Sequence, residues 1–236
     1  MPDYRYNLSV DVHDLDHNGV AKTSSLMRYM QSAAQSQLTS IGLSYDELKS
    51  RKRAFILSKI KMEFTRPIRA YEPLTAISYP CESRAFSFLR CYALTSAGET
   101  VGRAASIWAL VDTESRALVP VGSFDLPLPL LPHNDMSLDR IVMPSDAVMV
   151  GEYLVSYGIT DQNEHMNNTH YPDMYANFLP LDGAMIRAIS IQYMNEAPRG
   201  ERLSVYRALS DGIYYFKTVR EDGLVNTLAM VEIAEI

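Results

Sequence analysis

The alternation of apolar and polar positions divides the first half of the chain into strands and helices. In chain order the pattern predicts a strand at 4–12, a polar turn at 14–19, helices at 23–41 and 44–51, and strands at 54–64, 74–83, 87–96 and 100–112. Gly42 follows the first helix, as is typical of helix C-termini. Ser44 and Glu47 have the spacing of a capping box, which places the start of the second helix.

The second half repeats this order of elements. The pattern predicts a strand at 148–160, a polar turn at 161–168, helices at 171–178 and 181–186, and strands at 188–193, 202–209, 213–220 and 227–234. Asp211-Gly212 and Asp222-Gly223 are typical of tight hairpin turns, so they join the last three strands.

A proline-rich stretch separates the two halves. Five of the twelve prolines fall between 120 and 144. Because proline resists both helices and central strands, this stretch is predicted to be an extended connector. We therefore divide the chain into a first unit at 1–125, a connector at 126–144 and a second unit at 145–236.

Short sequence matches relate the two units to each other. Asp16-His17-Asn18 aligns with Asp161-Gln162-Asn163, Glu63-Phe64 aligns with Gln192-Tyr193, and Tyr71-Glu72-Pro73-Leu74 aligns with Gly200-Glu201-Arg202-Leu203. Each unit combines a helical stretch with an antiparallel sheet, which buries one face against the helix. The pattern predicts an α+β fold built from two such repeats.

Composition narrows the class of protein. Of the 236 residues 47% are hydrophobic, which is enough for one large core or two small ones, and the net charge of −6 argues against a nucleic-acid binder. Two cysteines do not make a secreted disulfide framework, and no apolar stretch approaches the length of a membrane span. With no apolar signal segment at its start, the chain is expected to work in the cytoplasm.

The densest cluster of polar residues that could take part in catalysis begins at Asp161. There the sequence reads Asp-Gln-Asn-Glu-His-Met-Asn-Asn-Thr-His-Tyr. This segment resembles the active-site motif of acyl-acyl carrier protein thioesterases, Asp-x-Asn-x-His-x-Asn-Asn-x-x-Tyr. The pattern matches at Asp161, Asn163, His165, Asn167, Asn168 and Tyr171. The resemblance extends over essentially the whole chain, including 55–60 and 102–104 in the first half.

The family's next motif, Glu-Tyr-Arg-Arg-Glu-Cys, is only partly kept. Here it reads Gln192-Tyr193-Met194-Asn195-Glu196-Ala197, so the tyrosine and the second glutamate match and the cysteine does not. If the alignment holds, Ala197 excludes a covalent thioacyl intermediate at that position.

The resemblance implies a tandem double hotdog fold and the hydrolysis of fatty acyl-acyl carrier protein thioesters, which releases free fatty acid and terminates chain elongation. It implies acyl carrier protein as the partner, and we expect no cofactor, no metal and no nucleic acid. The expected catalytic residues are Asp161, Asn163, His165 and Glu196. The first unit, which has no histidine at the position matching His165, is expected to form the acyl pocket and scaffold.

Residue chemistry suggests how these four side chains would divide the work. Glu196 would position and deprotonate water, with its pKa raised by burial beside the acyl tunnel. His165 would relay a proton and Asn163 would orient water or the thioester carbonyl. Asp161 would hold His165 or Asn163 in position, or cap the turn. In an extended segment Asp161, Asn163 and His165 would face one side. Backbone N–H groups near Asn167 and Asn168 would receive the oxyanion.

Simpler interpretations stay open from the residues alone. Asp161 and Asn163 are also common turn and cap residues, and His165 with His170 would suit a metal site only weakly, since the helical spacing of metal ligands is missing. The basic run 49–53 is either a solvated face or a docking patch for an acidic carrier protein. An acyl-CoA thioesterase and a non-catalytic acyl-binding hotdog protein remain alternatives, as do a monomer and a homodimer.

Overall fold

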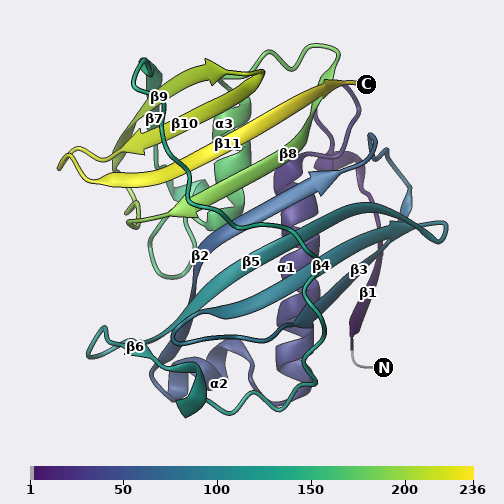
Figure 1. Cartoon of the computed structure of the whole chain (residues 1–236), viewed down its shortest axis with the longest axis vertical. Helices are drawn as coiled ribbons and strands as arrows, with labels where there is room; N and C mark the ends of the chain where they lie inside the picture. The colour runs from purple at the N-terminus through teal and green to yellow at the C-terminus, as the bar shows by residue number, and fades with distance from the viewer. Residues whose placement is uncertain (1–2) are drawn as a thin grey trace.

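The computed structural model describes residues 3–236, which form one eleven-stranded antiparallel sheet with helices on its concave side (Figure 1). The strand order is β1-β3-β4-β5-β2-β8-β11-β10-β9-β7, with β6 paired to β5. The strands are β1 Tyr4–Ser9, β2 Arg53–Phe64, β3 Pro73–Pro80, β4 Phe88–Ser96, β5 Glu99–Asp112, β6 Leu118–Val119, β7 Val148–Leu154, β8 Ala184–Tyr193, β9 Arg202–Ser210, β10 Ile213–Val219 and β11 Val225–Glu235.

The two repeats meet at the β2–β8 pair in the middle of the sheet. Lys61 pairs with Ser190, while Glu63 pairs with Ala188 and Lys59 with Gln192. The sequence match of Glu63 with Gln192 makes Lys59 the counterpart of Ala188 and Lys61 the counterpart of Ser190. Lys61 therefore faces its own counterpart, and the positions two residues to either side face each other's counterparts. Two repeats related by a local two-fold axis through the Lys61–Ser190 pair produce this register. The α+β tandem hotdog prediction is confirmed.

The helices of the first repeat form where the pattern predicts them. The long helix α1 Thr23–Ser40 crosses the concave side of the first-half strands, and α2 Tyr45–Ser50 follows after Gly42, whose φ is +76°. The Ser44 hydroxyl accepts a hydrogen bond from the Glu47 amide at 3.2 Å. The Glu47 carboxylate accepts from Arg51 instead of closing the capping box.

The second repeat has a much shorter helix. The helix α3 Tyr171–Ala176 is preceded by a 3-10 turn, Asn168–His170, and covers only part of the concave face. The helix predicted at 181–186 is wrong. Pro180 and Gly183, with φ of +69°, mark a turn there, and β8 starts at Ala184. The strand predicted at 148–160 ends at Leu154, because the chain turns through a 3-10 segment at Tyr157–Ile159.

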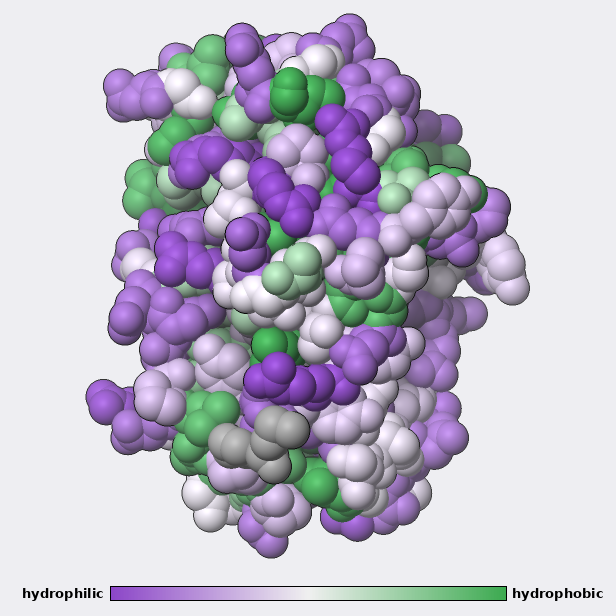
Figure 2. All heavy atoms as spheres, turned by 90° about the vertical axis from the view of Figure 1, so that its right-hand side faces the viewer, coloured by the Kyte–Doolittle hydropathy of each residue, from purple (hydrophilic) through white to green (hydrophobic). Residues whose placement is uncertain are grey.

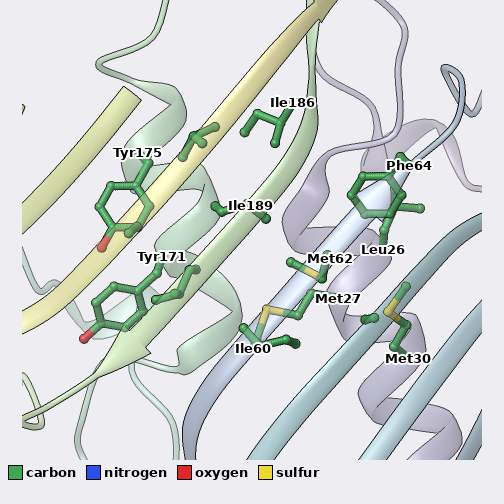
Figure 3. Close-up of a cluster of buried hydrophobic side chains, with 14 of the residues drawn as sticks. Leu26, Met27, Met30, Ile60, Met62, Phe64, Tyr171, Tyr175, Ile186 and Ile189 are labelled. Carbon is green, nitrogen blue, oxygen red and sulfur yellow. The ribbon is translucent and has the colours of Figure 1, made fainter. Parts of the chain in front are cut away.

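One hydrophobic core fills the space between the sheet and the helices of both repeats (Figure 3). Met27 and Met30 from α1 pack toward Ile60 and Met62 on β2, and all four side chains are at most 1% exposed. Met27 and Met30 are therefore core residues. From the second repeat Tyr171, Met174 and Tyr175 join the same core.

The connector lies across the outer face of the sheet, as the thin teal trace in Figure 1 shows. Its backbone carbonyls accept hydrogen bonds from Lys59 and Gln192, the two residues that face each other at the repeat junction, at 3.3 and 2.9 Å. Met136 from the connector packs against Cys81 and Cys91, both of which are buried free thiols. The connector thus covers the seam between the repeats.

The side of the molecule seen in Figure 2 is largely hydrophilic, with hydrophobic side chains scattered over it. Within residues 3–236 no helix has both the length and the apolar character that crossing a membrane requires.

Candidate active site

The loop 161–168 is a tight turn. The Asp161 amide donates to the His165 carbonyl at 2.9 Å, and the Asp161 carboxylate accepts from the Asn163 amide at 2.8 Å. Glu164 has a φ of 62°, which breaks any extended course. The predicted alternation of side chains along an extended segment is therefore wrong, because the loop turns back on itself. Asp161 acts here as a turn residue that fixes Asn163.

His165 and Glu196 are brought together by the pairing of two loops. The Met166 amide donates to the Ala197 carbonyl at 2.8 Å, and His165 forms an isolated bridge with Pro198. This pairing leaves 3.5 Å between His165 Nδ1 and Glu196 Oε2. The side chains are 32% and 55% exposed, so the expected burial of Glu196 is not observed. The pair is therefore open to water.

A buried polar network supports the loop that carries Glu196. Asn226, which is fully buried, donates from its side-chain amide to the Tyr171 hydroxyl at 3.0 Å and to the Asn195 carbonyl. Burial raises the pKa of Tyr171 to about 12, so its hydroxyl remains protonated near neutral pH. The Glu196 carbonyl accepts from Arg220 at 3.1 Å. Asn226 holds both the helix start and the Glu196 loop in place.

Of the two backbone N–H groups predicted to be free at the start of the second-repeat helix, one is already hydrogen-bonded. The Asn167 amide donates to the Ile159 carbonyl at 2.9 Å, so this group is not available to an oxyanion. The Asn167 side chain accepts from the Thr169 amide at 3.0 Å. The Asn168 amide has no acceptor among residues 3–236, and it is the one backbone donor of that predicted pair that can meet a ligand oxygen.

Asn163 is held by a residue from the other repeat. The Tyr45 hydroxyl donates to Asn163 Oδ1 at 3.2 Å, which connects α2 of the first repeat with the loop of the second. Gln31 of α1 makes a similar connection to Asn168 Oδ1 at 3.0 Å. Neither Tyr45 nor Gln31 is singled out by the sequence, because both are polar residues on helices where a solvated position is the ordinary interpretation.

A cavity of about 410 Å³ lies beneath this loop, mainly inside the first repeat. Residues of the loop line one part of it, and α1, α2 and the first-half strands line the rest. Its lining includes Ala34, Leu38, Tyr45, Leu48, Phe55, Phe88, Arg90, Tyr92, Trp108, Asn163, Asn167 and Thr169. His165 lies on the same loop between Asn163 and Asn167. An apolar cavity next to a few convergent polar groups is the usual form of a small-molecule site.

The matching turn of the first repeat has the same local geometry and different contacts. Asp16 accepts from the Asn18 amide at 2.9 Å, as Asp161 does for Asn163. The Asn18 side chain is used fully by the second repeat, since it donates to the Leu181 and Ala184 carbonyls. This turn joins the repeats. Its histidine, His17, pairs with Asp182 of the second repeat at 3.0 Å on an exposed surface, and the position that matches His165 is Val20.

The departures in the second motif have local explanations. Gln192 is bound to the connector on the outer face and does not reach the cavity. Ala197 is 1% exposed, and its carbonyl is used by Met166. The chain has two cysteines, and both lie under the connector. The described site therefore contains no cysteine. No cluster of three or more potential metal ligands occurs within the described part of the chain.

Together these observations define a tandem hotdog protein with a histidine–glutamate pair beside an apolar cavity. The sequence profile of the acyl-ACP thioesterase N-terminal domain matches residues 2–123, more than half of the 236 residues. The chain belongs to the acyl-ACP thioesterase family.

Individual relatives agree with this assignment. The chloroplastic acyl-[acyl-carrier-protein] hydrolase FATB2 of Cuphea viscosissima is 20% identical over 217 residues, which cover 83% of this chain and 52% of that protein. The chain thus spans about half the length of this curated relative.

Two solved structures have the same fold. An acyl-ACP thioesterase from Bacteroides thetaiotaomicron superposes with a TM-score of 0.85 at 19% identity, covering 99% of this chain and 98% of that one. The 12:0-ACP thioesterase from Umbellularia californica superposes with a TM-score of 0.84 at 16% identity, covering 100% of this chain and 98% of that one.

Proposed function

We propose that this protein hydrolyses thioesters between fatty acyl chains and acyl carrier protein, releasing free fatty acid and ending chain elongation. One observation carries the proposal. His165 lies on the loop whose residues Asn163 and Asn167 line the apolar cavity, and Glu196 of the adjoining loop reaches it with 3.5 Å between Nδ1 and Oε2. Family membership supports the choice of acyl carrier protein as the source of the chain.

In the proposed reaction a water molecule attacks the thioester carbonyl carbon. Glu196 accepts the proton of that water, and the exposed fractions of both side chains are compatible with water entry. Glu196 passes this proton to His165 Nδ1, and as the carbon–sulfur bond breaks His165 gives the proton on its Nε2 to the departing thiolate, which leaves as a thiol. The carbonyl oxygen receives hydrogen bonds from Asn163 Nδ2 and the Asn168 amide, while Asp161 keeps the turn that presents Asn163.

We assign the two repeats different tasks. The first repeat supplies the pocket for the acyl chain and the second supplies the catalytic loop, because the cavity lies mainly among first-half residues. One chain then contains a whole site, and we expect a monomer to be active. We place the protein in the cytoplasm, where the neighbouring thiols of Cys81 and Cys91 stay reduced.

The test is the release of free thiol from purified acyl-acyl carrier proteins of medium and long chain length, beside the matching acyl-CoAs. We expect the carrier substrates to react faster and both His165→Ala and Glu196→Ala to lose at least about a hundredfold in kcat, as removal of a general acid or base does. His170→Ala is the matched control, since it is a histidine of the same region outside the pair.

Other outcomes have definite meanings. Faster reaction with CoA substrates would keep the site and change the substrate. Absence of turnover with every thioester, or turnover that neither substitution reduces, would overturn the proposed function and leave an acyl-binding protein.

A further inference from the structure

Arg90 lies in β4 among the apolar residues that line the cavity. Phe88 and Tyr92, two positions away on either side, line the same cavity, which places all three on the concave face of the sheet. Arg90 is 7% exposed. A cation at this depth is unusual, because arginine is almost never fully buried without a charged partner.

The partners of Arg90 are neutral. Its Nη1 donates to Gln37 Oε1 at 2.6 Å and to Ser78 Oγ at 2.7 Å. None of the ion pairs formed within residues 3–236 includes Arg90. The groups that perturb its pKa are tyrosine and cysteine side chains, without a carboxylate among them.

The remaining donors of Arg90 face open space. Its Nε and Nη2 have no acceptor in the described part of the chain. In this part of the chain the side-chain atoms that lack a partner and are fully enclosed are Ser24 Oγ and Arg220 Nε. The two nitrogens of Arg90 are not among them, so they are not fully enclosed. Because Arg90 lines the cavity, these two donors reach its interior.

An unpaired cation in such a place is costly. Burial lowers the pKa of Arg90, yet a guanidinium keeps its charge in proteins. Removing one from water without a counter-charge costs several kcal/mol. Trp108, which also lines the cavity, adds a second polar side chain, and its indole N–H donates to Ser106 Oγ at 2.8 Å. A saturated chain that ends in a methyl group would fill this part of the cavity without satisfying any of these donors.

We propose that the cavity binds acyl chains that carry an oxygen function near their distal end, with a carboxylate preferred because it neutralises Arg90. The inference rests on the proposed thioesterase function and specifies its substrate class. A distal carboxylate accepts hydrogen bonds from the free guanidinium donors and supplies the missing negative charge. A hydroxyl or keto oxygen accepts the same bonds without the charge.

The experiment compares three series of acyl-carrier thioesters from hexanoyl to dodecanoyl, ending in a methyl, a hydroxyl or a carboxylate. At the best length we expect the carboxylate series to exceed the methyl series about tenfold or more in kcat/KM, which corresponds to a charged hydrogen bond. Arg90→Met should reverse this order. Arg103→Met is the control, since Arg103 lies on the neighbouring strand, pairs with Glu63 and is 52% exposed. Arg90→Gln provides a second variant should the methionine protein fail to fold.

A methyl preference in the wild type that Arg90→Met and Arg90→Gln leave unchanged would overturn the inference. Binding separates this failure from failure of the proposed function. If no thioester is hydrolysed, thermal shifts with free dicarboxylic and monocarboxylic acids of equal length decide. A larger shift with the dicarboxylic acid, lost in both Arg90 variants, supports the inference, and equal shifts in all proteins overturn it.

Discussion

The Tyr45 hydroxyl of the first repeat donates a hydrogen bond to Asn163 Oδ1 of the second repeat at 3.2 Å. Tyr45 and Asn163 both line the cavity. The bond occupies the amide oxygen of Asn163 and leaves its NH₂ group to donate to another acceptor. The orientation of the Asn163 side chain in one repeat thus depends on a helix in the other.

Removal of the Tyr45 hydroxyl tests this dependence. We expect Tyr45→Phe to reduce kcat about tenfold with little change in KM, because the cavity keeps its shape while Asn163 loses the bond that orients it. Stability should change by no more than about 1 kcal/mol. The measurement is steady-state thiol release together with denaturant unfolding. Tyr71→Phe is the matched control, since the Tyr71 side chain is 75% exposed, and an equal loss in both variants would contradict this role.

Much of the fold follows from the sequence because it depends on local patterns. Gly42, Ser44 and the alternation along the strands place α1, α2 and the sheet within a few residues. The register of the repeat junction agrees with the weak match of Glu63 with Gln192, although that match does not predict it. The helix predicted at 181–186 fails because short apolar runs suit helices and strands equally.

The candidate site is less predictable, because its contacts come from distant segments. The resemblance singles out His165 and Glu196, and the structure places them together, although their roles stay a prediction. Tyr45 and Asn226 could not be found from the sequence, since their importance depends on which loops they meet. The exposure of Glu196 likewise depends on packing between loops, which periodicity does not describe.

Asn226 should affect both stability and activity. Asn226→Leu keeps the size of the side chain and leaves the Tyr171 hydroxyl and the Asn195 carbonyl without their partner. We expect a loss of about 2 to 4 kcal/mol in the free energy of unfolding, since buried polar groups become unsatisfied. The kcat should fall as well, because the adjacent Glu196 loses its support.

Comparison with Thr227→Val separates the two effects. Thr227 belongs to the same buried network through Tyr175 and Thr218, and within residues 3–236 its side chain makes no hydrogen bond to the Glu196 loop. Equal stability loss with an undiminished kcat is expected for this variant. If both variants lose kcat in proportion to stability, Asn226 has no special part in positioning Glu196.

The basic run 49–53 provides a test of carrier docking. Tyr45, Leu48 and Arg53 line the cavity, so the run lies beside it. Three of its four cations are already paired: Arg51 with Glu47 and Lys52 with Glu114, each at 2.7 Å, and Arg53 with Asp112. If the run binds an acidic carrier protein, Arg51→Glu with Lys52→Glu should raise KM for acyl-carrier substrate about tenfold and leave KM for acyl-CoA nearly unchanged.

The control for this double variant is well matched. Arg187 is 53% exposed, as Arg51 is, and Arg202 is 58% exposed against 57% for Lys52. Arg187→Glu with Arg202→Glu changes the net charge equally at another surface. An unchanged KM in the first variant, or the same rise in both, would show that the run is a solvated face.

Glu72 should contribute to the acid sensitivity of the fold. Hydrogen bonds from Arg66 lower the pKa of Glu72 to about 2 from its usual 4.5, and the Glu72 side chain is 14% exposed. Because the folded protein holds this carboxylate ionised more strongly than the unfolded chain does, its contribution is complete above pH 4.5 and disappears as the pH falls toward 2. After allowance for solvent screening we expect about 1 to 2 kcal/mol.

The difference in unfolding free energy between wild type and Glu72→Gln is the quantity to measure. It should be constant from neutral pH down to about pH 5 and shrink steadily below that, since both proteins then carry an uncharged side chain. Glu82→Gln is the control, because Glu82 is 79% exposed and lies 3.8 Å from its partner Arg84. A difference that grows as the pH falls would contradict the assignment, because it would require the pKa of Glu72 to be raised by folding.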